Sequence, residues 1–171
     1  MKKRFTLTCL WITLFTSGLL AQQTYEVLVE RPNEKTFKGF ISSEILAADT
    51  SFVKWYVPNQ KAYSPYAAAQ ESLTRNKDSV QLLVFMGTWC EDSQFIIPKL
   101  FALTAAAGFP GERITLVGVD RKKTTFGHLA EAMNITNVPT IIVLKKGKEL
   151  GRVVEYGKTG MFDKDLAEIF K

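Results

Sequence analysis

From residue 80 to the C-terminus, short apolar runs alternate with patterns of helical period. Two apolar runs of strand length, Gln81–Met86 and Arg113–Val119, are separated by a helical pattern. That arrangement predicts parallel strands joined by a right-handed crossover. Thr140–Lys145 and Glu149–Val154 flank a short Gly-containing link, so we expect an antiparallel hairpin. The predicted order is βαβαββα, an α/β core with a mixed sheet and helices on both faces.

Three helices are predicted around these strands. The first begins at Glu91 and ends before Gly108, a residue that suits the left-handed position after a helix. Pro98 lies inside this helix and predicts a kink. Thr124 or Thr125 is expected to cap the second helix. Each helix has one apolar face, made by Ile96, Leu100, Leu103 and Ala107 in the first, Phe126, Leu129, Ala130 and Met133 in the second, and Phe162, Leu166, Ile169 and Phe170 in the third.

Residues 22–79 are predicted to form a mostly helical extension packed on a domain of residues 80–171. The extension opens with two extended pieces, Tyr25–Glu30 and Lys35–Ile41. We expect Pro58 to end a first longer helix. A second should start at Ser64 and Pro65. The expected buried positions are Phe52, Trp55 and Tyr56 in the first of these helices, and Tyr66, Ala69 and Leu73 in the second.

The first 21 residues have the parts of a secretory signal peptide. A basic start is followed by the apolar stretch 7–20, and Ala21 offers a small residue at the cleavage site. The apolar stretch is shorter than the ~20 residues of a membrane-spanning helix. We therefore expect cleavage after Ala21 and export to the periplasm without stable membrane insertion. An uncleaved leader, which would anchor the protein in the membrane, is the alternative.

The charge balance does not indicate a nucleic-acid-binding protein. The leader carries three of the 22 basic residues, and the remainder exceeds the 17 acidic residues by only two. The longest basic run, 121–123, is typical of a solvated loop. One cysteine outside the leader and one histidine, His128, cannot by themselves form a structural zinc site, which normally takes four ligands. We expect no metal and no cofactor.

Cys90 is the candidate reactive group because it is the only cysteine outside the predicted leader. It follows an apolar strand and a Gly87-Thr88 turn, which places it at the start of a helix. Unpaired backbone N–H groups and the positive end of the helix dipole favour thiolate over thiol at that position. Glu91 and Asp92 complement the same dipole, but their negative charge opposes thiolate formation.

The segment Trp89-Cys90-Glu91-Asp92-Ser93 resembles the active-site turn of the thioredoxin-like superfamily. Pro98, eight residues after Cys90, matches the proline of the active-site helix, and Val138-Pro139-Thr140 matches the loop with a cis proline. In detail the segment looks like that of exported or membrane-associated bacterial members that carry a Trp-Cys-x-Asp-Ser turn. The resemblance covers residues 80–171 and implies a thioredoxin-like fold and thiol–disulfide exchange.

The resemblance also assigns roles to residues. It makes Cys90 the nucleophile, and Ser93 stands where dithiol members have a resolving cysteine. Ser93 is expected to donate a hydrogen bond to the Cys90 thiolate, but it cannot form a disulfide. Val84 replaces the buried acid of thioredoxins. The implied substrate-binding residues are Trp89, Val138, Pro139 and, with a weaker claim, Thr140.

Two classes of function follow from these features. The first is thiol–disulfide exchange through mixed disulfides with protein or small-molecule thiols, resolved by an external thiol or by the substrate. The second is a non-catalytic peptide- or protein-binding module that uses the surface around Trp89 and Pro139. No motif specific to a peroxidase or a glutathione transferase is evident. A catalytic role for His128 is not expected, because it lies away from the apolar stripe of its helix.

Overall fold

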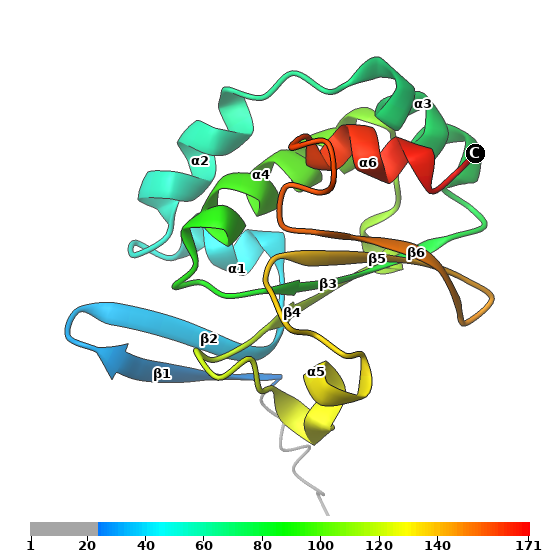
Figure 1. Ribbon diagram of the computed structural model, residues 1–171. Coiled ribbons are helices and arrows are strands. Elements are labelled where there is room, and N and C mark those ends of the chain that lie inside the picture. The colour runs from blue at the N-terminus through cyan, green and yellow to red at the C-terminus, as the bar shows by residue number, and fades with distance from the viewer. Residues whose placement is uncertain (1–23) are drawn as a thin grey trace, which may run out of the picture.

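A six-stranded mixed sheet forms the centre of the computed structural model, which describes residues 24–171 (Figure 1). The strand order is β1-β2-β4-β3-β5-β6. The predicted leader lies outside the described residues. The strands are β1 (Tyr25–Arg31), β2 (Glu34–Ile41), β3 (Gln81–Met86), β4 (Ile114–Gly118), β5 (Thr140–Lys145) and β6 (Lys148–Val154), and the α-helices are α1 (Ser43–Ala48), α2 (Val53–Lys61), α3 (Ala67–Asn76), α4 (Glu91–Ala106), α5 (Leu129–Ala132) and α6 (Phe162–Glu168).

The predicted βαβαββα core is confirmed. Strand β3 runs parallel to β4 and antiparallel to β5, and β5 pairs antiparallel with β6. Helix α4 connects the two parallel strands β3 and β4. The chain therefore reaches the carboxyl end of β3, at the middle of the sheet, immediately before Cys90.

The N-terminal extension adds a hairpin to this sheet. Strand β1 pairs antiparallel with β2, and β2 pairs antiparallel with β4. Gly39 and Gly118 face each other where β2 meets β4. A Cβ atom on Gly118 would collide with the carbonyl oxygen of Phe37, so this close approach requires glycine. The two extended pieces predicted from the sequence thus become the last two strands on one side of the central sheet, with β1 at its edge.

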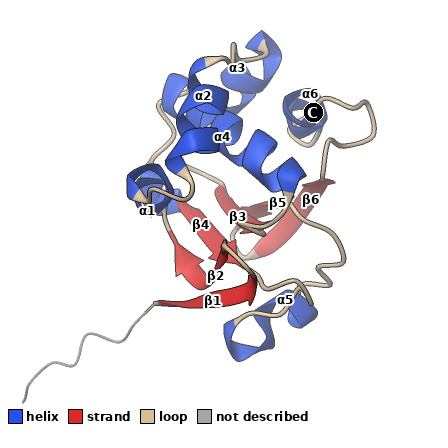
Figure 2. Cartoon of the chain, turned by 90° about the vertical axis from the view of Figure 1, so that its left-hand side faces the viewer, coloured by secondary structure: helices blue, strands red, loops and turns tan. Residues whose placement is uncertain are grey.

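Both faces of the sheet are covered. Helices α1, α2, α3, α4 and α6 lie on one face, and the short α5 lies on the other (Figures 1 and 2). Strand β3 contributes to both cores because its side chains alternate: Leu82, Val84 and Met86 belong to the larger cluster, and Leu83 and Phe85 to the smaller one. A strand buried on both faces explains the continuous apolar run in the sequence.

The end of α4 matches its prediction. Gly108 has φ +60°. Its N–H donates to the carbonyl of Ala105, and that of Phe109 donates to the carbonyl of Thr104. This is the Schellman pattern, which satisfies carbonyls at a helix end. Pro98 lies inside α4, which spans 16 residues.

Three of the predicted helix boundaries are wrong. Pro58 does not end α2, which continues to Lys61, and the Asn59 side chain donates to the carbonyls of Trp55 and Gln94. Helix α3 begins at Ala67 because Tyr66 keeps an extended backbone, and Tyr66 is exposed.

The third wrong boundary concerns the helix expected after Thr124 or Thr125. Gly127 and His128 have φ values of +60° and +55°. These left-handed residues divide the segment into a 3₁₀ turn, Phe126–His128, and the four-residue α5. No Thr125 side-chain capping bond forms. Ala130 is buried as expected, whereas Phe126 is exposed.

No helix among residues 24–171 is both long and apolar enough to span a bilayer.

Candidate active site

Cys90 is the N-cap residue of α4 and is partly buried. Its side chain makes no capping hydrogen bond to the helix. Instead, the thiol Sγ donates to the carbonyl oxygen of Val138 at 3.2 Å. The fold therefore brings together the Cys90 turn and the proline loop, the two segments that were predicted to meet. Cys90 thus stands at the end of α4 where the first backbone N–H groups have no partner within the helix.

Ser93 does not make the predicted contact with Cys90. Its hydroxyl oxygen accepts a hydrogen bond from the backbone N–H of Gly87 at 3.2 Å, and the residue is fully buried. No hydrogen bond joins the Ser93 and Cys90 side chains among the described residues. The first turn of α4 points Ser93 back toward the preceding loop. In this conformation its contact supports the turn that precedes the thiol.

The proline loop forms one wall beside the thiol, which we call the proline wall: residues 137–140 with Glu155. The Val138–Pro139 peptide bond is cis, the isomer that the family resemblance implies. Val138 and Thr140 are buried, and the Thr140 hydroxyl donates to the carbonyl of Asn137 at 2.7 Å. The N–H of Glu155 donates to the carbonyl of Pro139 at 2.7 Å. The Thr140 side chain is thus turned inward, and this wall presents mainly backbone.

Trp89 forms the opposite wall, which we call the tryptophan wall: Thr88 and Trp89 with Arg121 and its partners. The indole Nε1 donates to the carbonyl of Val119 at 3.0 Å. A Cβ atom on Gly87 would lie 2.6 Å from the Trp89 ring, so the ring rests directly on this glycine. The guanidinium of Arg121 lies over the indole, 4.9 Å from a ring centroid.

The β1–β2 hairpin holds Arg121 and Thr88 in place. The Arg121 guanidinium makes two-pronged hydrogen bonds of 2.6–2.8 Å to Glu34, and its backbone N–H donates to Glu30. Thr88 accepts from the N–H of Phe37 and donates to the carbonyl of Lys35. The tryptophan wall is thus attached to the N-terminal extension by contacts between residues far apart in the chain.

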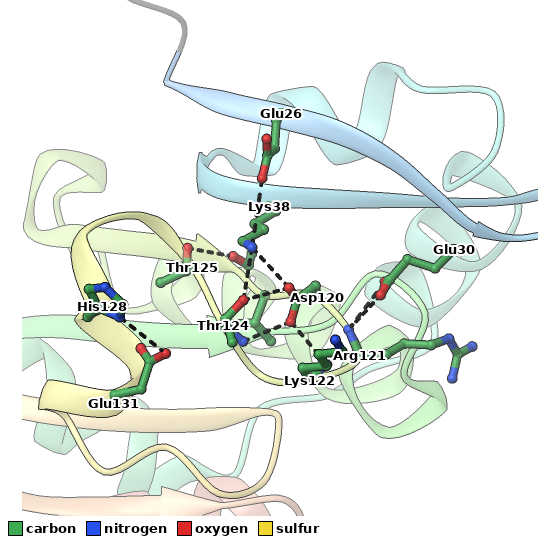
Figure 3. Close-up of polar contacts among 12 residues, drawn as sticks. Glu26, Glu30, Lys38, Asp120, Arg121, Lys122, Thr124, Thr125, His128 and Glu131 are labelled. Atoms are coloured by element: carbon green, nitrogen blue, oxygen red, sulfur yellow. Dashed lines mark hydrogen bonds and ion pairs between the residues drawn. The ribbon is translucent and has the colours of Figure 1, made fainter.

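An ion-pair network shapes the loop that carries Arg121. Lys38 lies between Asp120 and Glu26, at 2.9 Å and 3.8 Å, as Figure 3 shows. Asp120 also accepts hydrogen bonds from Thr124 and from the backbone of Lys122. Burial alone raises the pKa of the Asp120 carboxyl, but the Thr124 and Lys38 hydrogen bonds and the Lys38 charge outweigh it, so the pKa is lowered. Folding therefore favours the ionised carboxylate.

Glu91 and Asp92 occupy the first turn of α4 as predicted. Glu91 is exposed and Asp92 is half-buried. Tyr156, in the loop after β6, lies close to Asp92 and Cys90. Burial, followed by its interaction with Asp92 and the nearby negative charge, raises the pKa of Tyr156. Its ring lies 5.9 Å from that of Phe95 on α4. These two aromatic residues complete the rim near Asp92.

The remaining titratable candidate lies elsewhere. His128 is highly exposed and 3.6 Å from Glu131, as drawn in Figure 3. Within residues 24–171, no group of three or more His, Cys, Asp and Glu side chains has an arrangement that could hold a metal ion. Val84 is fully buried, so an apolar side chain occupies the position of the acid found in thioredoxins.

Comparisons with known proteins give the family. The thioredoxin family model matches residues 66–168, more than half of the chain. The chain belongs to the thioredoxin family. Membership supports thioredoxin-like thiol–disulfide exchange at the level of the family, whose proteins act on protein thiols and disulfides.

Individual thioredoxins align with the same part of the chain. A thioredoxin from Echinococcus granulosus is 31% identical over 84 residues, which cover 49% of this chain and 73% of that protein. A thioredoxin from Chlamydia trachomatis is 34% identical over 84 residues, with coverages of 49% and 72%. Among solved structures, an HIV epitope scaffold superposes with a TM-score of 0.50 at 17% identity, covering 72% of this chain and 84% of the scaffold. That likeness concerns the fold alone.

The thioredoxin match begins after the β1–β2 hairpin and α2. The proline wall lies within it, whereas Glu30, Glu34 and Phe37 lie before it. Sequence reasoning did not find Arg121 or Tyr156 as site residues. Arg121 belongs to a basic run that looks solvated. A tyrosine after the last strand carries no sequence signal that it lies near a cysteine 66 positions earlier in the chain.

Proposed function

We propose that the protein is an exported thioredoxin-family protein that exchanges disulfides through Cys90 alone. The observation that carries the proposal is the partly exposed thiol at the start of α4, in contact with the residue before the cis proline. The disulfide of a partner reaches the Cys90 thiol from the side between Trp89 and the proline wall. The negative charges of Glu91 and Asp92 modulate how readily the thiolate forms.

The exchange requires two steps with different attacking sulfurs. First, the Cys90 thiolate attacks one sulfur of a partner disulfide. That S–S bond breaks, a Cys90–partner disulfide forms, and the second partner sulfur leaves as a thiolate that takes up a proton. Ser93 cannot perform the second attack, because it has no sulfur. An external thiolate, or a second cysteine of the substrate, attacks the partner sulfur and releases Cys90 as a thiolate.

The proposed recognition surface consists of Trp89 and the backbone around Val138 and Pro139. The Trp89 ring is half-buried and lies next to Cys90. The inward hydroxyl of Thr140 leaves this residue a supporting role. The proposed partners are protein or small-molecule thiols and disulfides in the periplasm, without a nucleic acid or a cofactor. The leader predicted from the sequence supports the location.

Trapping in cells tests the function. Native protein should form mixed disulfides that acid quenching and alkylation preserve and that a reductant releases. The Cys90→Ala variant is the blank. Intact-mass analysis of exported protein gives the mature N-terminus and any adduct on Cys90 in one measurement. If no adduct forms and Cys90 reacts no faster than a free cysteine, the exchange function is wrong.

The S–H donation to Val138 favours a second candidate function. The Cys90 thiol already has a hydrogen-bond partner in the Val138 carbonyl, as expected of a binding module whose Cys90 is chemically idle. Cys90→Ser separates the candidates, because serine retains a hydroxyl donor to the same carbonyl. Exchange requires sulfur and is lost in this variant, whereas pure binding is retained.

A further inference from the structure

A small cleft lies on the outer side of Trp89, between the N-terminal hairpin and α2. Its volume is about 250 Å³, and we call it the hairpin cleft. Seven of its ten lining residues come from positions 33–55, before the thioredoxin match begins. The lining residues are Asn33, Glu34, Lys35, Ser51, Phe52, Lys54, Trp55, Thr88, Trp89 and Gln94.

Hydrogen bonds and an ion pair hold lining residues of the hairpin cleft in place. Lys35 is held by Asp49 at 2.6 Å, and its carbonyl accepts from Thr88. The Gln94 side-chain amide donates to the carbonyl of Thr88 at 2.8 Å, and the backbone carbonyl of Gln94 accepts from the Asn59 side chain of α2. Because these contacts are made within the chain itself, they hold the lining residues of the cleft in fixed positions.

Size and position limit what the cleft can take. Pockets for small molecules and cofactors measure about 300–1,000 Å³, so a cleft of about 250 Å³ suits one side chain of a larger partner. Trp89 and Thr88 belong both to this cleft and to the turn that carries Cys90. A side chain in the cleft therefore comes from a residue near the partner's reacting cysteine.

The charges in the cleft select the side chain. Glu34 is paired with Arg121, and Lys35 with Asp49. Lys54 is exposed, and its ammonium group makes no ion pair or hydrogen bond with any residue of the described chain. The cleft therefore has one uncompensated positive charge, beside two indole rings whose edges are electropositive.

We propose that the hairpin cleft binds the carboxylate of an acidic residue that flanks the reacting cysteine of a partner polypeptide. Lys54 supplies the opposite charge, and Trp55 and Trp89 line the approach. This inference rests on the exchange function proposed above, and it makes the N-terminal extension the specificity element of the site.

Peptide disulfides test the proposal directly. Three peptides are identical except that glutamate, glutamine or lysine flanks a single cysteine, which carries a 2-thiopyridyl group. The Cys90 sulfur attacks the peptide sulfur. The bond between the peptide sulfur and the thiopyridyl sulfur breaks, and a Cys90–peptide disulfide forms. The electron pair and the thiol proton leave with 2-thiopyridone, whose absorbance gives the rate. Wild-type protein should react with the glutamate peptide about two- to five-fold faster than with the glutamine peptide, the effect of one exposed ion pair.

Two variants distinguish an effect of the cleft on the reaction rate from an effect of the protein's overall electrostatic field. Lys54→Gln should abolish the preference for glutamate, so that the ratio of the rates with the glutamate and glutamine peptides falls to about one. Lys61→Gln removes the same charge from the far end of α2 and should keep the preference. Equal rates with all three peptides, or equal effects of the two variants, overturn the proposal.

A binding measurement decides the case if Cys90 proves unreactive. Peptides with serine in place of cysteine are titrated into Cys90→Ser protein, and the indole N–H resonances of Trp55 and Trp89 are followed by NMR. The glutamate peptide should shift both resonances at lower concentration than the glutamine peptide, and Lys54→Gln should remove the difference. Absence of a shift overturns the cleft proposal on its own. Lack of reaction with every peptide disulfide, with the shifts present, overturns only the exchange function.

Discussion

The two walls beside Cys90 are built in different ways. The proline wall is made within the thioredoxin match by backbone hydrogen bonds and a buried threonine. The tryptophan wall depends on side chains of Glu34, Arg121 and Thr88, which join the active-site turn to a hairpin outside that match. The thioredoxin core thus supplies the thiol and one wall, and the chain-specific extension fixes the other.

Because of this difference, the two walls should respond differently to changes of side chain. Backbone contacts of the proline wall tolerate changes in most side chains, because main-chain atoms make them. Removal of a single charge, or addition of one methyl group to the sheet, can alter the tryptophan wall. Perturbing each wall alone should therefore give distinct signatures.

The largest effect is expected from Gly118→Ala. The new methyl group would collide with the carbonyl oxygen of Phe37, where β2 joins the sheet, and rigid backbone cannot move away cheaply. We expect the free energy of unfolding to fall by roughly 3 kcal/mol. Denaturant titration measures the change. Gly111→Ala, whose methyl group would meet no atom within 4 Å, should change the free energy by less than about 0.5 kcal/mol.

Asp120→Asn should be next in size. Asparagine replaces one acceptor oxygen with an NH₂ group that faces donors of Thr124 and Lys38, so a loss of about 1–3 kcal/mol is expected at neutral pH. The pKa of Asp120 is lowered by folding. Its stabilisation is therefore complete above the unfolded pKa of about 3.9 and is lost as the pH falls through the lower folded value. The stability difference between the wild type and the variant should shrink on acidification. A difference that grows below about pH 4 would contradict this assignment.

Thr140→Val tests the proline wall alone. The substitution keeps the shape but leaves the carbonyl of Asn137 without its hydroxyl donor. The free energy of unfolding should fall by about 1 kcal/mol. The Trp89 indole N–H resonance should stay in place, because the contacts of this wall do not reach the indole. Displacement of that resonance would show that the two walls are coupled.

Glu34→Gln should have the smallest effect on stability and the clearest effect on the tryptophan wall. Both partners of the Glu34–Arg121 pair are about one quarter exposed, so the loss should be at most about 1 kcal/mol. The Trp89 indole resonance should shift, because Arg121 loses its anchor above the ring. Glu149→Gln removes a similar two-pronged pair with Arg152 far from the thiol and should leave the resonance unmoved. Equal spectra for the two variants would contradict the anchoring role.

The spacing of apolar and polar positions along the sequence was sufficient to predict the elements of the core. Strand β3 is apolar at every inward position on both faces, and Gly108 ends α4, so local signals agree with the final structure. Cys90 and Val138 meet as expected, because both follow from the order of elements around β3 and β5.

Contacts between distant segments could not be predicted in the same way. Nothing in Lys35–Ile41 indicates that this strand pairs with β4, or that its neighbours Glu30 and Glu34 hold Arg121. The direction of the Ser93 hydroxyl depends on the free N–H of Gly87, which only the folded turn presents. The left-handed backbone at His128 broke a helix that the apolar spacing favoured.

The serine buried behind Cys90 also has a kinetic consequence under the proposed function. A second sulfur in the same turn would make release of a partner unimolecular, with a fixed lifetime for the intermediate. With Ser93 in that position and Cys90 as the free cysteine of the described chain, a partner that lacks a second thiol stays bound until another molecule collides with it. The lifetime of such a complex is then inversely proportional to the concentration of free thiol in the surroundings, so the protein reports the thiol content of its compartment as a dwell time.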